Sequence, residues 1–160
     1  MFAITAYRYP SSNESGMTFS APRPSNDMGL AVLRFATLLF FFQHPAAKFL
    51  HVPAVPSLAH VELLSLLGLA GVIEIVCGAL VLTGFHGRIA AFILSGEMAF
   101  AYFIGHAPRD VFPALNGGEP AALYCFVFLY LAWAGCGAWT IDGLRRDEKQ
   151  SQALVQTKAY

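Results

Sequence analysis

The segment LLSLLGLAGVIEIVCGALVLTGF, residues 63–85, decides the fold class of this chain. A helix needs about 20 mostly apolar residues to cross the hydrocarbon core of a bilayer, and this segment has that length. A helix of a soluble bundle carries a polar stripe along one side, whereas Glu74 is the single charged residue here. The segment therefore predicts a transmembrane helix.

Three further apolar blocks surround this segment. The stretch ALYCFVFLYLAWAGCGAW, residues 122–139, also lacks a polar stripe. The blocks that begin near Met28 and Ile89 reach spanning length only if their polar ends lie at the membrane interfaces. Hydrophobic residues make up 56% of the 160-residue chain and charged residues 12%, where a soluble domain has about 25% charged residues. We predict an all-α, integral membrane four-helix bundle with helices over about 28–50, 62–85, 87–106 and 119–139.

The predicted helical domain, residues 28–143, lies between two polar ends of the chain. Residues 1–27 are rich in serine and proline and predict a flexible tail. We do not expect a cleaved signal peptide, because a long polar stretch precedes the first apolar block. Residues 144–160 are charged and predict a short extramembrane helix or a loose tail. The formal net charge of zero argues against a nucleic-acid partner. From the apolar segments we predict that the lipid bilayer surrounds the helical domain.

The distribution of lysine and arginine predicts the orientation. With four spans, both ends of the chain lie on one side of the membrane. That side carries most of the basic residues: Arg8, Arg23, Arg88, Arg145, Arg146, Lys149 and Lys158. The other side carries only Lys48 and Arg109. Because cytoplasmic segments of membrane proteins are enriched in basic residues, we predict that both termini are cytoplasmic.

Three ionisable residues lie inside the predicted spans: Arg34, Glu74 and Glu97. A charge at the bilayer centre is costly, so such residues normally face the bundle interior and have partners. With a rise of about 1.5 Å per residue, the three can share one depth. We predict an Arg34–Glu97 pair with Glu74 near it. Such a group is either an ionic lock that fixes the helix register or a proton or ligand site, with Glu74 as the better candidate for a proton carrier.

A second polar cluster lies at the outer ends of the predicted helices: His44, Lys48, His106, Asn116 and Glu119. Its members either cap helices and close the loop HAPRDVFPALNGGEP, residues 106–120, or form a mouth that receives a quinone head group or a small solute. Pro45 follows His44 and predicts a kink. We predict no metal site, because no third ligand has suitable spacing, and no CxxC pair supports a dithiol relay.

The order of these motifs resembles the DoxX family over residues 29–143. The matching features are the Leu33-Arg34 opening, the His44 and Lys48 pair, and GVIEIVCGALVLTGFHGRIAAFILSGEMAFAYFIGHAPRDVFPALNGGEPAALY, residues 71–124. The closing GCGAWTID, residues 135–142, also matches. Two departures from the family pattern, Pro45 and Cys136, concern local backbone shape.

The resemblance implies a small four-helix protein of the bacterial inner membrane. Many relatives are described as oxidoreductases without demonstrated chemistry, and the resemblance implies no agreed catalytic residue. We favour a membrane subunit or scaffold of a redox or detoxification assembly, with redox proteins as partners and no intrinsic cofactor, because no electron-carrying motif is present. This hypothesis predicts a closed bundle whose charges are fully paired.

Two alternatives remain open. A quinone-linked oxidoreductase or binder of small hydrophobic molecules predicts an apolar cavity of about 300 Å³ or more near His44 and His106, with polar groups converging on it. A proton-coupled transporter is less favoured, because four helices are few for transport and a homo-oligomer would then be needed.

Overall fold

The computed structural model describes residues 24–58 and 61–158, and within these ranges the chain forms helices and turns without strands. This part of the chain confirms the all-α prediction. In chain order its helices are α1 (Pro24–Phe41), α2 (Gln43–Phe49), η1 (Pro56–Leu58), α3 (Leu66–Thr83), α4 (Gly87–Ala101), η2 (Tyr102–His106), α5 (Pro113–Asn116), α6 (Glu119–Ala134) and α7 (Ile141–Lys158).

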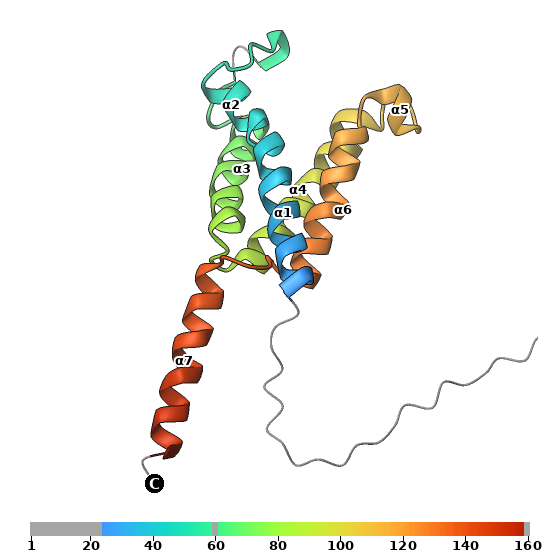
Figure 1. Cartoon of the computed structure of the whole chain (residues 1–160). Helices are drawn as coiled ribbons and strands as arrows, with labels where there is room; N and C mark the ends of the chain where they lie inside the picture. Colours follow the sequence, from blue (N-terminus) through green and yellow to red (C-terminus); the bar gives the residue numbers. More distant parts are fainter. Residues whose placement is uncertain (1–23, 59–60, 159–160) are drawn as a thin grey trace, which may run out of the picture.

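Four of these helices, α1, α3, α4 and α6, form the body of the molecule (Figure 1). α4 packs on α3 and most extensively on α6, and α1 packs on both α3 and α6. The start of α1, the α3–α4 turn and the start of α7 lie at one end of this body, which we call the α7 end. α2 and α5 lie at the opposite, α2–α5 end. Large side chains fill the interior between the four helices: Leu38, Phe41, Val81, Leu94, Phe128 and Leu131.

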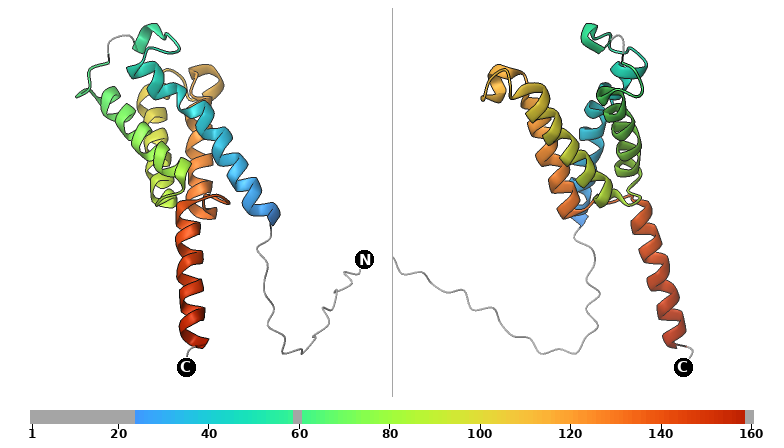
Figure 2. Two further views of the ribbon diagram at one scale, coloured as in Figure 1. Left: turned by 60° about the vertical axis from the view of Figure 1, so that its left-hand side comes forward. Right: turned by 180° about the vertical axis from the view of Figure 1, so that it is seen from behind.

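α3 and α4 are joined by a tight turn and diverge from it. Gly84 in this turn has a φ of +65°, a conformation that favours glycine, and His86 has a φ of +49°. Seen from behind, the two helices are close at the α7 end and separate toward the α2–α5 end (Figure 2, right). Lys48, Glu74 and Glu97 line the space between these two diverging helices.

In the described part of the chain, three helical segments are long and apolar enough to cross a membrane: Asn26–Phe49, Leu66–Thr83 and Gly87–His106, with 24, 18 and 20 residues. α6 is apolar but shorter, with 16 residues. Three of the four predicted spans are therefore supported by length and composition. The fourth span and the sidedness of the termini stay predictions.

Several helix boundaries differ from the predicted ones. α1 begins at Pro24 rather than near residue 28, so the predicted tail loses its last residues, and residues 1–23 lie outside the described part of the chain. α3 begins at Leu66, because the Ser65 side chain caps it by accepting a hydrogen bond from Gly68 N at 3.1 Å. α6 ends at Ala134, because Gly135 has a φ of +101°.

The first apolar block is bent. α1 ends at Phe41 and α2 begins at Gln43, and Phe42 between them has a ψ of −12°. Pro45 has no amide hydrogen, so the carbonyl of Phe41 loses its helical partner. The break thus lies one turn before the proline at which a kink was predicted. Beyond the bend, α2 packs against α3.

The link between α6 and α7 lies against the first turns of α1. The amide of Ala138 donates a hydrogen bond to the carbonyl of Asp27 at 3.0 Å. Gly137 has a φ of +74°, and a Cβ atom there would overlap the carbonyl oxygen of Asp27. Two separate constraints, backbone conformation and space, therefore require glycine at this position.

Replacement of Gly137 by alanine is expected to lower the free energy of unfolding by about 1–3 kcal/mol, because the new methyl group is strained and collides with backbone atoms. SDS titration of the protein in mild detergent micelles measures this change. Gly29→Ala is the matched control, because no atom lies within 4 Å of a Cβ at Gly29. An equal effect of both substitutions would contradict the assignment of Gly137 as a contact point.

Candidate functional site

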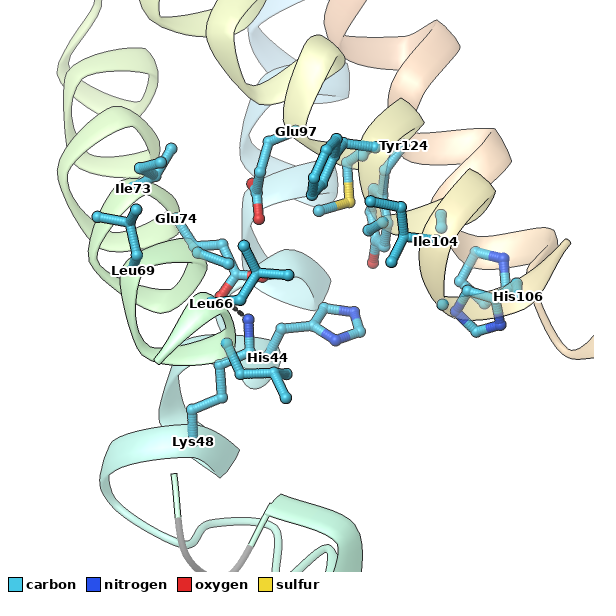
Figure 3. A pocket seen from close by; sticks show the side chains of 18 of the residues that line it. His44, Lys48, Leu66, Leu69, Ile73, Glu74, Glu97, Ile104, His106 and Tyr124 are labelled. Atoms are coloured by element: carbon cyan, nitrogen blue, oxygen red, sulfur yellow. Dashed lines mark hydrogen bonds and ion pairs between the residues drawn. The ribbon is translucent and has the colours of Figure 1, made fainter. Parts of the chain in front are cut away.

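A cavity of about 890 Å³ lies between α3 and α4 and is bordered by α2 and α6 (Figure 3). This volume is within the usual range for small-molecule sites, about 300–1,000 Å³. The lining is mostly apolar and includes five histidine, lysine and glutamate side chains: His44, Lys48, Glu74, Glu97 and His106. The arrangement is that of an apolar site with a few placed polar groups.

The Lys48–Glu74 ion pair forms the buried polar wall of this cavity. Lys48 Nζ donates to Glu74 Oε2 at 2.7 Å. Lys48 is 7% exposed and Glu74 is 2% exposed. α2 supplies the lysine and the middle of α3 supplies the carboxylate. Each charge compensates the other where water is largely excluded, so the pair joins α2 to α3.

Gly71 makes room for this pair. It lies one turn before Glu74 on α3, and a Cβ there would be 3.1 Å from Lys48 Cδ and 2.6 Å from a ring carbon of Phe49. The absence of a side chain lets α2 approach α3 closely.

Glu97 contributes an unpaired carboxylate oxygen. Its Oε2 atom is buried and makes no hydrogen bond within the described ranges 24–58 and 61–158. Figure 3 shows the carboxyl group pointing from α4 into the cavity, toward the Lys48–Glu74 pair. A buried acceptor without a donor is costly, so this oxygen is a point at which a bound molecule gains an interaction.

Arg34 does not line the cavity, and the predicted Arg34–Glu97 pair is wrong. The fully buried guanidinium donates to the carbonyls of Cys136 at 2.6 Å and of Ala138 and Trp139 at 3.1 Å each. These carbonyls belong to the α6–α7 link, where no helix satisfies them. Arg34 therefore lies at the α7 end, at another depth from the cavity, and holds that link against α1.

Glu97, rather than Glu74, is the carboxylate that lacks a partner. The sequence-based hypothesis chose Glu74 as the less compensated of the two. It treated Lys48 as a residue of the outer mouth, whereas the bend at Phe42 and the gap at Gly71 bring the lysine onto Glu74.

The five residues of the predicted outer mouth separate into two groups. His44, Lys48 and His106 line the cavity. Asn116 is buried in the loop instead: its side chain donates to the carbonyl of Asp110 at 2.8 Å and accepts from Gly118 N at 2.7 Å. Glu119 lies in the first turn of α6 and borders a different groove, between α1 and α6. For Asn116, these contacts support loop closure.

Tyr124 is a lining residue that the sequence analysis missed. It lies on α6, and its ring makes an edge-on contact with the His44 ring at a centroid distance of 5.9 Å. Phe41 packs edge-on against Tyr124 at 5.3 Å. The sequence contained one signal for it: the hydroxyl group of a tyrosine within an apolar helix usually needs a hydrogen-bond partner or a polar environment.

The cavity is open between α3 and α4. Apolar side chains on α3, on α4 and on η2, which continues α4, line it and remain largely exposed: Leu66 at 62%, Leu69 at 56%, Phe100 at 53% and Ile104 at 53%. Both helices are among the segments apolar enough to span a membrane. An apolar chain can therefore extend from the polar wall through this opening into hydrocarbon.

In the described part of the chain, no three His, Cys, Asp or Glu side chains lie close enough to hold a metal ion. The cysteines Cys77, Cys125 and Cys136 are free and not paired with one another.

Comparison with known proteins gives two matches. The DoxX family model matches residues 29–107, which include Lys48, Glu74 and Glu97. A protein of Haemophilus influenzae (strain ATCC 51907 / DSM 11121 / KW20 / Rd), described as uncharacterized, is 44% identical over 117 residues. This alignment covers 71% of the present chain and 87% of that relative. No solved structure matches the chain.

Proposed function

The chain belongs to the DoxX family, and we propose that it binds a small amphipathic molecule that enters from the lipid bilayer. One observation carries the proposal: the 890 Å³ cavity has a buried polar wall and an exposed apolar opening. A molecule with a compact polar head and an apolar tail matches both parts. The head would lie near Lys48, Glu74 and Glu97, and the tail between α3 and α4.

This proposal replaces the scaffold as the favoured hypothesis. A non-catalytic scaffold predicts a closed bundle with fully paired charges. A large cavity and the unpaired Glu97 oxygen support a binder instead. A role within a redox or detoxification assembly is compatible with binding, since such an assembly could use the bound molecule as its substrate.

A quinone couple is one class of molecule that suits these groups, because its hydroquinone form carries hydroxyl groups that could donate to the unpaired Glu97 oxygen. The His44 ring lines the same cavity and could contact a ring oxygen. When bound, a quinone would supply two-electron redox chemistry, while the residues of this chain would bind and orient it. No CxxC pair supports a dithiol that would reduce it.

The proposed topology has four spans with both termini in the cytoplasm of a bacterial cell. α7 carries Arg145, Arg146 and Lys149, and these basic residues would then lie on the cytoplasmic side. α6, although short, runs alongside α4 over the height of the body (Figure 1). The α2–α5 end would face outward.

Labelling of single cysteines in intact spheroplasts tests this topology. In a background without Cys77, Cys125 and Cys136, Ala114→Cys in α5 should react with a membrane-impermeant maleimide from outside. Ser151→Cys in α7 should react only after lysis. Labelling of both positions from the same side would contradict four spans.

Ligand binding is tested by native mass spectrometry of the protein released from mild detergent with its bound lipids. We expect a co-purifying small molecule of defined mass that is lost in Gly96→Leu. A Cβ atom at Gly96 meets nothing within 4 Å, and Gly96 lines the cavity, so we expect the leucine to occupy space that the bound molecule needs.

The control for Gly96→Leu is Gly29→Leu, which adds the same side chain at another open helical position. It should keep the bound molecule. A wild-type spectrum without any bound species, or equal occupancy in wild type and Gly96→Leu, would contradict the proposed function.

A further inference from the structure

We infer that the bound molecule presents a hydrogen-bond donor, a hydroxyl or amine group, to Glu97, and that Glu97 determines this specificity. The inference rests on the proposed function and names the chemistry of its ligand. It follows from three features of the cavity: the unpaired acceptor, the balance of charges and the position of the aromatic rings.

The unpaired acceptor is Glu97 Oε2, which is buried and lacks a donor among residues 24–58 and 61–158. A head group that carries only acceptors, such as an ether or a ketone, would leave this oxygen without a donor and add a lone pair beside it. A hydroxyl or amine would satisfy it. Sites with buried polar groups reject analogues that lack the complementary group, because the site's own group is then left unpaired.

The charged side chains of the cavity also favour a head group that donates a hydrogen bond. Among residues 24–58 and 61–158, Lys48 is the single Lys or Arg side chain that lines the cavity, and its ammonium group is already bonded to Glu74 at 2.7 Å. Two carboxyl groups therefore share one cation. This surplus of acceptors disfavours an anionic head such as a fatty-acid carboxylate or a phosphate and favours a head that donates.

Two aromatic rings offer a packing surface for a head group in the cavity that Glu97 also lines. His44 and Tyr124 line the same cavity, and their rings are in edge-on contact. A ring of the ligand can pack against them, as aromatic pairs prefer offset or edge-on geometry. A phenol-type head with an alkyl tail then fulfils all three features. Of a quinone couple, the hydroquinone is the form that carries the required donors.

Two probes that differ by a single methyl group test the inference on the full-length protein in nanodiscs: para-dodecylphenol, which donates a hydrogen bond, and para-dodecylanisole, its methyl ether, which cannot. We expect the phenol to bind tighter by about 10- to 100-fold, the difference that one hydrogen bond to a charged or buried group makes. Competition measured by native mass spectrometry gives the ratio. para-Dodecylbenzylamine, a donor that carries a positive charge, should also outcompete the ether.

Variants of Glu97 identify the responsible group. Glu97→Met removes the acceptor at similar volume, so the phenol-to-ether ratio should fall to near one while binding of the ether persists, which shows that the cavity is intact. Glu97→Gln keeps an acceptor oxygen and should retain part of the preference. Equal binding of phenol and ether to the wild type would overturn the inference and leave the proposed function standing. Binding of none of the probes would overturn both.

Discussion

Replacement of Lys48 by methionine is expected to lower the free energy of unfolding by about 3–5 kcal/mol, since it leaves the buried Glu74 carboxylate without its cation. Lys48 Nζ lies 2.7 Å from Glu74 Oε2, and no other salt bridge is present in the described ranges. Methionine keeps most of the volume of the lysine stem, so the effect reports on charge rather than packing. SDS titration in mild detergent micelles, followed by circular dichroism, measures it.

The double variant Lys48→Met, Glu74→Met is the control. Removal of both charges eliminates the uncompensated carboxylate, and replacement of a buried pair by apolar groups is often neutral or stabilising. We expect it to recover stability to within about 1–2 kcal/mol of the wild type. A double variant as unstable as Lys48→Met would show that the lysine acts through packing, in contradiction of the ion-pair account.

Replacement of Arg34 by methionine is also expected to lower the free energy of unfolding strongly. It removes three hydrogen bonds from a charged donor to the carbonyls of Cys136, Ala138 and Trp139. Hydrogen bonds to charged groups contribute about 1.5–3 kcal/mol each, and neighbouring ones are not additive, so we expect a loss of about 3–5 kcal/mol in the free energy of unfolding. Hydrogen exchange should accelerate first at residues 136–140, the link that Arg34 holds.

Arg34→Lys is the matched variant, because it keeps the positive charge but replaces the planar guanidinium and its several donors by one compact ammonium group. It should recover part of the stability. Ligand occupancy should change little in Arg34→Lys, because Arg34 does not line the cavity. A complete loss of the bound molecule in Arg34→Lys, with the fold retained, would contradict the separation of Arg34 from the site.

The helical architecture could be predicted from the sequence because the length of an apolar segment can be read directly along the chain. The long apolar run at 66–83 and the tight turn at Gly84 are visible without any contact information. Helix ends were less predictable, since they depend on local caps. Ser65 starts α3 and Gly135 ends α6, each several residues inside the apolar block.

The site was predicted in composition but not in pairing. Glu74, Glu97, His44 and Lys48 were recognised as polar residues of the interior and its mouth, and all four line the cavity. The partner of each depends on how the helices tilt, and depth counted along straight helices misassigned Arg34. The bend at Phe42 brings Lys48 into the interior. The α6–α7 link supplies the backbone carbonyls to which Arg34 donates.

The central claim is that a small amphipathic molecule binds between α3 and α4. Photo-crosslinking with a diazirine-bearing alkylphenol in nanodiscs, followed by peptide mapping, tests it most directly. We predict crosslinks at cavity-lining residues such as Leu69, Ile73 and Ile104, lost in Gly96→Leu and in excess unlabelled phenol. Crosslinks spread equally over the exposed faces of α1 and α6, at residues such as Leu39 and Phe126, and insensitive to competitor, would contradict the claim.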